Sequence, residues 1–402
     1  MSRHTFSCFL FFCIASMASL AQVIAPPAAQ RLVIHSNVLN EDREIWVRMP
    51  IAAQGKKERY PALYITDAGG NINEIGSTID FLADNNSIPP LIVVGIANTD
   101  RIRDLTPSHA DVKHSDGTVD AMPTSGGGDK FLDFIQTELI PEIEKRYATH
   151  PYRILAGHSL GGLFTIHAMI NRPALFNAYI ATSPSLWWDD FHTLHQAQEF
   201  FAKQKEFKKS LFFSLASEGG DMSEGFEQLQ KTLNANRPKE FLVESARYME
   251  ETHGSTELVG HYGGLHAIFA GWKRSRDEKT DEKIGGLEAI DQHYRKLSER
   301  FGFKVSAEKE INSFGYNQLG SKKIDEALAA FRRNVELYPE SANVYDSLAD
   351  GLEAADKPDL ALQSVEKAVE VATQSGDPLL PDFKKHLERL VAERKSAGKK
   401  EQ

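Results

Sequence analysis

A serine lies between two glycines at residues 157–161, which read G-H-S-L-G. G-x-S-x-G is typical of a tight strand-to-helix turn that exposes a serine hydroxyl as a nucleophile. The residues at 153–156 read as the end of a strand and those at 163–171 as a helix, which is the context that the motif needs. Glycines flank the serine because bulky neighbours would clash in such a strained turn. The pattern therefore predicts that Ser159 is a nucleophile, and the alternative is an ordinary glycine-serine turn.

A serine nucleophile needs a histidine base, and after this kind of turn the chain order is serine, acid, histidine. His253 is the expected base because R-Y-M-E-E-T-H-G-S-T places it in a loop of small residues after a strand-like run. His261 and His266 are weaker candidates. Three other downstream histidines are interpreted as helix residues, namely His167, His192 and His195.

The acid that orients the histidine is expected after the apolar strand S-L-F-F-S-L-A at 210–216. Glu218 and Asp221 both follow that strand, and the two glycines between them indicate a loop that can turn a side chain inward. Either carboxylate can hold the imidazole tautomer and stabilise its cation. Asp221 is preferred because it is set back from the strand end, and Glu218 is the alternative. A Ser159–His253 dyad without an acid is the third interpretation.

Two backbone N–H groups are expected to bind the oxyanion that forms during acyl transfer. The Leu160 N–H lies at the start of the predicted helix, where the helix dipole favours negative charge. The second donor is expected in the glycine-rich loop D-A-G-G-N at 67–71. Gly69 is preferred there and Ala68 is the alternate, because a glycine-rich loop lets the backbone approach a substrate closely.

Two adjacent tryptophans close the run S-P-S-L-W-W at 183–188, which follows another predicted strand. Trp187 and Trp188 are expected to wall an acyl pocket, and packing in the core is an equally good interpretation. The chemistry needs no metal and no cofactor, because a serine, a histidine and an acid supply the nucleophile, the base and its partner.

The elements that position these residues alternate between strands and helices from about 32 to 273. Buried strands are expected in the runs Y-P-A-L-Y-I-T-D, P-P-L-I-V-V-G-I, Y-R-I-L-A-G, A-Y-I-A-T-S-P and S-L-F-F-S-L-A. Helical patterns such as D-K-F-L-D-F-I-Q-T-E-L-I-P-E-I-E-K-R-Y lie between them. Such alternation predicts an α/β fold with a mostly parallel sheet that is covered on both faces.

The chain changes character after Trp272. A charge-rich connector, R-S-R-D-E-K-T-D-E-K, leads to a helix at 286–302 and then to an internal repeat. Ala327 and Ala361 are 34 residues apart (361 − 327), which is the tetratricopeptide period. Two tetratricopeptide-like repeats are therefore predicted, with a last helix as a cap. A generic pair of helical hairpins is the alternative.

The N-terminus combines Arg3, a short apolar block and small residues up to Ala21. These features predict a secretory signal peptide that is cleaved after about Ala21. A membrane anchor is the alternative, but the apolar block is short for a span. Both cysteines, Cys8 and Cys13, lie in this segment, so a mature chain would contain neither disulfide nor thiol. A periplasmic or secreted protein without a stable membrane anchor is expected.

The composition limits the partners. The 402 residues include 46 Lys and Arg against 56 Asp and Glu, which gives a formal net charge of −10. A chain this acidic is a poor non-specific binder of nucleic acid, so no nucleic-acid partner is expected.

Residues 31–273 resemble the esterase D-like branch of the α/β-hydrolases, which includes ferric enterobactin esterase-type enzymes and S-formylglutathione hydrolase. The motifs that carry the resemblance are L-Y-I-T-D-A-G-G, A-N-T-D-R-I-R-D-L-T-P, A-G-H-S-L-G-G-L-F, S-P-S-L-W-W and E-E-T-H-G-S. The resemblance implies an α/β-hydrolase domain at 22–275. The signal peptide at 1–21 precedes it, and a charged linker with a helix at 276–305 follows. An all-α repeat domain with a capping helix at 306–402 completes the chain.

The resemblance also implies a serine esterase that works through an acyl-enzyme and acts on a small-molecule ester. Siderophore-type esters, carbohydrate acyl esters and small synthetic esters are all left open as substrates, because a fold does not choose among them. Acyl transfer by the same residues is one alternative. A non-catalytic interaction protein is another, in which the repeats recruit a protein partner or a second copy.

Overall fold

The structure is a computed structural model, and it describes residues 27–53, 58–113, 116–275 and 285–398. The predicted signal peptide with both cysteines lies outside the described residues, and so does most of the charged connector. Within the described ranges, every helix is too short or too polar to cross a bilayer.

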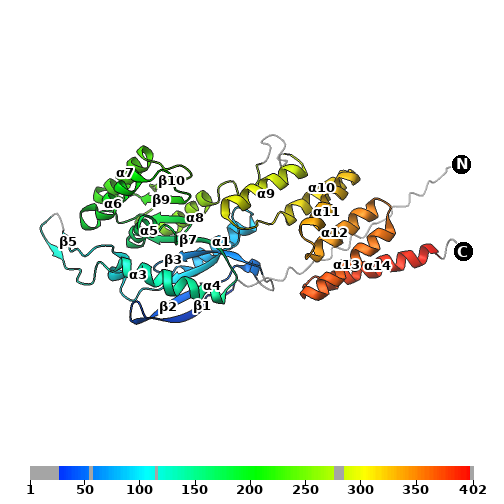
Figure 1. The fold of residues 1–402 in the computed structure, drawn as a ribbon, viewed down its shortest axis with the longest axis horizontal. Coiled ribbons are helices and arrows are strands. Elements are labelled where there is room, and N and C mark those ends of the chain that lie inside the picture. The colour runs from blue at the N-terminus through cyan, green and yellow to red at the C-terminus, as the bar shows by residue number, and fades with distance from the viewer. Residues whose placement is uncertain (1–26, 54–57, 114–115, 276–284, 399–402) are drawn as a thin grey trace, which may run out of the picture.

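An eight-stranded sheet forms the centre of the larger part of the molecule (Figure 1). Its order is β1-β2-β4-β3-β7-β8-β9-β10, in which β2 pairs antiparallel with β1 and β4 and all other neighbours are parallel. This arrangement confirms the predicted α/β class. The strands are β1 (Gln30–Ser36), β2 (Glu41–Arg48), β3 (Tyr60–Ile65), β4 (Ile92–Ile96), β7 (Thr149–His158), β8 (Ala178–Thr182), β9 (Ser210–Ala216) and β10 (Leu242–Tyr248). A separate short hairpin pairs β5 (Val112–Lys113) with β6 (Val119–Asp120).

Helices cover both faces of the sheet, so the central strands are apolar along their whole length. Every residue of β3 is buried, for example. One face carries α1 (Ile72–Asp84) and α8 (Thr256–Ile268). The other face carries α3 (Gly128–Phe134), the π-helical turn Ile135–Leu139, α4 (Ile140–Arg146), α5 (Leu160–Asn171), α6 (Trp188–Lys203) and α7 (Gly220–Ala235). Two short helices complete this part, the 3-10 turn Ile51–Ala53 and α2 (Arg101–Leu105).

The C-terminal part is all helical, as the sequence predicts. Its helices are α9 (Leu287–Phe301), α10 (Glu308–Gly320), α11 (Ile324–Leu337), α12 (Ala342–Ala354), α13 (Pro358–Ser375) and α14 (Leu380–Gly398). The Phe331 ring packs so closely on Gly315 and Gly351 that a Cβ on either glycine would overlap it. Ala327 and Ala361 are fully buried. These close contacts agree with paired helices of a repeat, and the tetratricopeptide assignment stays a prediction.

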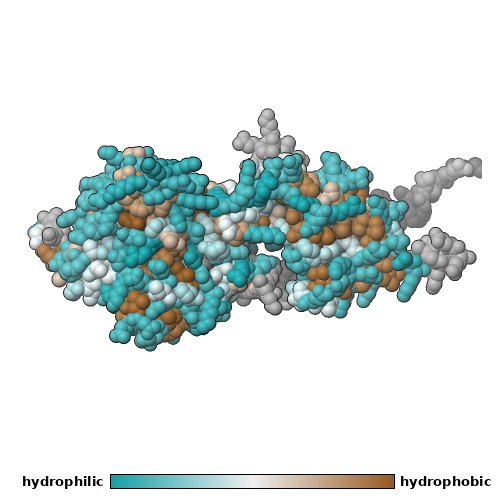
Figure 2. Space-filling view, in the orientation of Figure 1, coloured by the Kyte–Doolittle hydropathy of each residue, from teal (hydrophilic) through white to brown (hydrophobic). Residues whose placement is uncertain are grey.

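Helix α9 packs against both parts of the molecule, between the sheet and the C-terminal helices (Figure 1). Leu297 and Phe301 belong to the core on the α1 and α8 face, where the Phe301 ring lies 5.2 Å from the Tyr152 ring. Ile290, on the same helix, packs with Ile311 of α10. Residues predicted as part of a linker thus form a shared packing element. The face of the molecule in Figure 2 is mostly hydrophilic over both parts, with scattered hydrophobic patches.

A charged cluster fastens α14 to α12. His386 of α14 places Nδ1 2.7 Å from Asp346 and Nε2 2.8 Å from Glu353. Arg389 also binds Glu353, with both terminal nitrogens within 2.8 Å of its carboxylate. The hydrogen bond to Asp346 is the largest cause that raises the pKa of His386 to about 9, and Glu353 adds to it. A histidine that is 12% exposed is therefore protonated at neutral pH.

We expect the docking of α14 to weaken as the pH rises from about 6.5 to 9. The folded pKa of His386 exceeds the unfolded value, so its contribution is complete below about 6.5 and is lost through the folded pKa. After allowance for solvent screening, the loss is about 1–2 kcal/mol in the free energy of opening. This loss should appear as faster hydrogen exchange of the α14 amides at high pH. The increase should be smaller in a His386→Gln variant, which lacks the titrating group. Equal pH dependence in both proteins would contradict the assignment.

Candidate active site

Ser159 forms a sharp turn between β7 and α5. Its backbone has φ 60° and ψ −117°, a strained conformation for a residue with a side chain. A Cβ on Gly157 would overlap the Gly161 carbonyl, and a Cβ on Gly161 would overlap the Thr66 hydroxyl. The strand, the strained serine and the helix therefore have the arrangement that the G-x-S-x-G motif predicts, and the close contacts explain both glycines.

The Ser159 hydroxyl lies beside the loop that follows β8. Its Oγ is 3.2 Å from the Ser185 Oγ, and the Ser185 N–H donates to the Ser159 carbonyl at 3.1 Å. The part of the chain that the structure describes shows no hydrogen bond between Ser159 and His253. Such bonds are often long in a free enzyme and shorten when substrate binds.

His253 contacts the carboxylate of Glu218. The Nδ1 atom lies 2.5 Å from Glu218 Oε1, in a pair whose side chains are 44% and 11% exposed. The other oxygen, Oε2, accepts from the Ser183 hydroxyl at 2.6 Å and from the Ala216 N–H at 3.2 Å. These donors fix the carboxylate, and the carboxylate fixes the imidazole. A contact at Nδ1 leaves Nε2 as the nitrogen that is available for a proton from a serine.

The preference for Asp221 as the acid needs correction, because Glu218 occupies that place. Helix α7 begins at Gly220, so Asp221 lies in its first turn and is exposed. A carboxylate there is favourable at the positive end of the helix dipole. Glu218 instead lies two residues after the end of β9, where the parallel strands bring it to the same edge of the sheet as Ser159.

The loop that carries His253 is held by its backbone. The Ser217 N–H donates to the Glu251 carbonyl at 3.0 Å, and the Thr252 N–H donates to the Ser255 hydroxyl at 2.9 Å. The other downstream histidines contact different residues. His261 is buried in α8 with Nδ1 against the Glu257 carbonyl, and His266 is exposed beside Tyr262. His167 contacts Asp129 from α5, and His192 and His195 belong to α6.

The loop after β3 differs from the expectation for the oxyanion donors. The Gly69 N–H donates to the Asp67 carbonyl at 2.8 Å, and the Ala68 N–H donates to the Ile96 carbonyl at 3.2 Å. Both candidate donors are thus engaged. The Asp67 N–H has no acceptor among the described residues, and neither has the Leu160 N–H at the start of α5. The loop therefore offers a different N–H from the ones predicted.

Two residues of the run A-N-T-D-R-I-R-D hold the Asp67 side chain, and no role was predicted for either of them. Arg101 binds both carboxylate oxygens of Asp67, at 2.8 and 3.0 Å, and Asn98 donates to the first of them. The Arg101 Nη2 also lies 3.4 Å from the His158 carbonyl. The clamp ties the loop after β3, where Asp67 has φ 62°, to the turn at Ser159. The signal in the sequence that could have found Asn98 and Arg101 was their place in the motif A-N-T-D-R-I-R-D.

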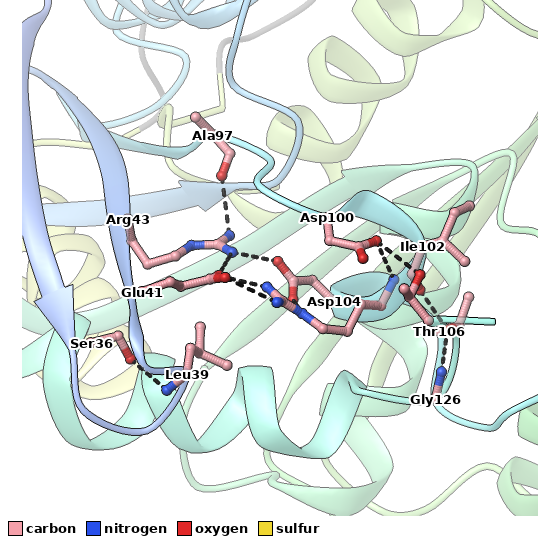
Figure 3. A network of polar contacts seen from close by, with 12 residues as sticks. Ser36, Leu39, Glu41, Arg43, Ala97, Asp100, Ile102, Asp104, Thr106 and Gly126 are labelled. Carbon is pink, nitrogen blue, oxygen red and sulfur yellow. Dashed lines mark hydrogen bonds and ion pairs between the residues drawn. The ribbon is translucent and has the colours of Figure 1, made fainter. Parts of the chain in front are cut away.

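A buried network anchors the short helix that carries Arg101 (Figure 3). Arg43 of β2 is fully buried and donates to Asp104 at 2.6 Å. Arg103 forms two hydrogen bonds with Glu41, at 2.6 and 3.0 Å. Buried charges are tolerated when they are paired in this way. The network therefore fixes α2 against the sheet.

The two tryptophans differ in position. Trp188 is 2% exposed in the core and donates from Nε1 to the Ser108 carbonyl at 3.1 Å. Of the two interpretations of Trp188, packing in the core agrees with this position, because its ring is buried and its N–H is bonded. Trp187 is partly buried next to it, with ring centroids 6.1 Å apart.

Curated proteins with similar sequences include esterases. The chain is 31% identical to the ferri-bacillibactin esterase BesA of Bacillus subtilis (strain 168) over 172 residues, which are 39% of this chain and 59% of that protein. It is 43% identical to the siderophore triacetylfusarinine C esterase of Aspergillus fumigatus over 82 residues, which are 20% of this chain and 28% of that protein. The chain therefore spans less than two thirds of the length of either relative.

A solved structure is also similar. The crystal structure of an IroE-like serine hydrolase from Shewanella oneidensis has a TM-score of 0.68 and 28% identity, and it covers 77% of this chain and 99% of its own. The model of the Esterase family matches residues 36–273, a span that includes Ser159, Glu218 and His253. Since that match covers more than half of the sequence, the chain belongs to the Esterase family.

Proposed function

We propose that the protein is a serine esterase that hydrolyses carboxylic esters through an acyl-enzyme. The observation that carries the proposal is the 2.5 Å contact between His253 Nδ1 and Glu218 Oε1, at the sheet edge where Ser159 adopts its strained turn. The nucleophile, the orienting acid and the base thus follow the ends of β7, β9 and β10, at one edge of the sheet. Membership of the Esterase family supports the same reaction class.

In the proposed mechanism, Ser159 attacks the ester carbonyl while His253 takes the hydroxyl proton at Nε2. Glu218 holds the imidazole through Nδ1 and stabilises the imidazolium that forms. The protonated His253 then gives its proton to the leaving alcohol. Water attacks the acyl-enzyme with His253 as the base again, and Ser159 is released.

The oxyanion is assigned to two backbone donors in this proposal. The Leu160 N–H begins α5, where the helix dipole adds a partial positive charge. The Asp67 N–H is a donor of the loop after β3 that has no acceptor among the described residues. Arg101 and Asn98 support this role because they bind the Asp67 carboxylate, which keeps its negative charge paired beside the site.

The substrate class proposed is a siderophore-type ester. Two curated relatives are named as a siderophore triacetylfusarinine C esterase and a ferri-bacillibactin esterase, and these names are the support for choosing that class over carbohydrate acyl esters. We propose a periplasmic or secreted location from the N-terminal signal-like segment. The C-terminal helices are proposed as tetratricopeptide-like repeats that bind a protein partner or a second copy.

Purified protein should be screened with siderophore lactones, acylated sugars and p-nitrophenyl esters, with a fluorophosphonate as a label. We expect the label on Ser159, and kcat/KM at least about tenfold higher for a siderophore lactone than for the simple esters. Label on another residue would contradict the mechanism. A preference for acylated sugars would leave the mechanism intact and overturn the substrate class.

A further inference from the structure

The ring of His158 lies against the ring of His253, and the mechanism above gives this contact no role. The ring centroids are 4.5 Å apart and the planes are tilted by 48°. We propose that His158 is a positioning residue whose neutral ring fixes the orientation of His253 and stabilises its imidazolium. The inference rests on the proposed function, since it takes His253 as the base.

His253 needs such support because it lies in an exposed loop. His253, Gly254 and Ser255 are all exposed. The carboxylate of Glu218 fixes one atom of the imidazole, and a ring held at one atom can still turn about that contact. A second ring packed on its face restricts this motion. Small errors in the placement of a reacting group lower rates by large factors.

His158 is a suitable support because it belongs to a central strand. It is the last residue of β7 and lies in register with Thr182 of β8. Helix α8 covers this row so closely that a Cβ on Gly260 would overlap the Thr182 side chain. Groups on strands are placed more accurately than groups on loops. His158 thus places a strand residue against the exposed loop that carries His253.

The charge state of His158 suits the same role. Burial lowers the pKa of His158, and the neighbouring His253 lowers it further. Glu257 of α8 and a backbone contact with His253 act in the opposite direction, and His261 of α8 adds to the lowering. A neutral ring presents an electron-rich face to a cation, whereas a second cation would repel the imidazolium.

We ascribe the effect to the ring, and the nitrogens of His158 are the alternative, because this side chain also has a hydrogen bond with the His253 backbone. The His158 Nε2 atom is buried and has no hydrogen-bond partner among the described residues. Three substitutions separate the role of the ring from the role of its nitrogens. His158→Phe keeps the ring and removes the nitrogens, His158→Gln keeps a polar group and removes the ring, and His158→Ala removes both.

We expect kcat of His158→Phe to stay within about threefold of the wild type. In His158→Gln and His158→Ala, kcat should fall about ten- to a hundredfold with KM unchanged. Titration of the His253 ring by NMR should give a pKa about half a unit lower in those two variants than in the wild type, because the face that stabilises the cation is lost. The phenylalanine variant should keep the wild-type value.

Two results would overturn the inference. One is an alanine variant with wild-type kcat and an unchanged His253 titration, and the other is a phenylalanine variant as slow as the alanine variant. If the alanine variant fails to fold, the phenylalanine and glutamine variants decide between ring and nitrogen. The NMR titration needs no turnover. Failure of the label to react with Ser159 in the wild type would therefore count against the proposed function alone.

Discussion

Ser159→Ala is expected to lose ester hydrolysis by about five orders of magnitude in kcat. The alanine has no oxygen to attack the carbonyl, so no acyl-enzyme can form, and only the oxyanion donors and binding remain. Single-turnover and steady-state assays with a p-nitrophenyl ester would measure the loss. The fold should be unaffected, because the Ser159 hydroxyl has one recorded partner, Ser185 Oγ at 3.2 Å.

Ser185→Ala is the matched control for that prediction. It removes a neighbouring hydroxyl of the same size from the loop after β8, and we expect kcat to fall less than about tenfold. Comparable losses in both variants would mean that the two hydroxyls act as a unit. Retention of more than about one per cent of activity by Ser159→Ala, with contaminating esterases excluded, contradicts the assignment of the nucleophile.

The order of elements and the nucleophilic turn could be predicted because both depend on local sequence. Strands that are buried on both faces read as continuous apolar runs, as in the fully buried β3 and β9. The turn at Ser159 needs glycines at short range, and the contacts of Gly157 and Gly161 show why. In β3, in β9 and at the Ser159 turn, the structure that the local sequence favours is the one that the fold adopts.

The acid could not be chosen from the sequence, because the choice depends on where α7 begins. Glu218 and Asp221 are three residues apart, and both follow the same strand. The N-terminus of α7 takes Asp221 to the surface, and Ser183 from the neighbouring strand end holds Glu218 in place. Ser183 is distant in sequence, so its hydroxyl gives no local signal.

Two other features were beyond the sequence for the same reason. The Ala68 N–H is engaged by Ile96 at the end of β4, which is a tertiary hydrogen bond. Phe301 of α9 packs on Tyr152, which is 149 residues earlier in the chain (301 − 152). The sequence predicts a helix after the charged connector, but it does not show which residues the apolar face of that helix contacts.

Glu218→Gln is expected to lower kcat by about three to four orders of magnitude, while Asp221→Asn should stay within about threefold of the wild type. The amide of glutamine can donate to Nδ1, which favours the tautomer with its proton on Nε2, and that tautomer cannot accept the serine proton. A loss of comparable size follows when the triad aspartate of a serine protease is replaced by asparagine. Stopped-flow acylation with a p-nitrophenyl ester would measure it directly.

The pair of substitutions is matched, since each changes to its amide one carboxylate that follows β9. Ser183 and the Ala216 N–H both donate to Glu218 Oε2, and a glutamine can keep its carbonyl oxygen there. The variant should therefore fold normally, with its defect confined to the imidazole contact at the other atom. A large loss in Asp221→Asn with little change in Glu218→Gln would reverse the assignment. Near-full activity in the double variant would show that Ser159 and His253 work as a dyad, because no other carboxylate is recorded at His253 Nδ1 in the described residues.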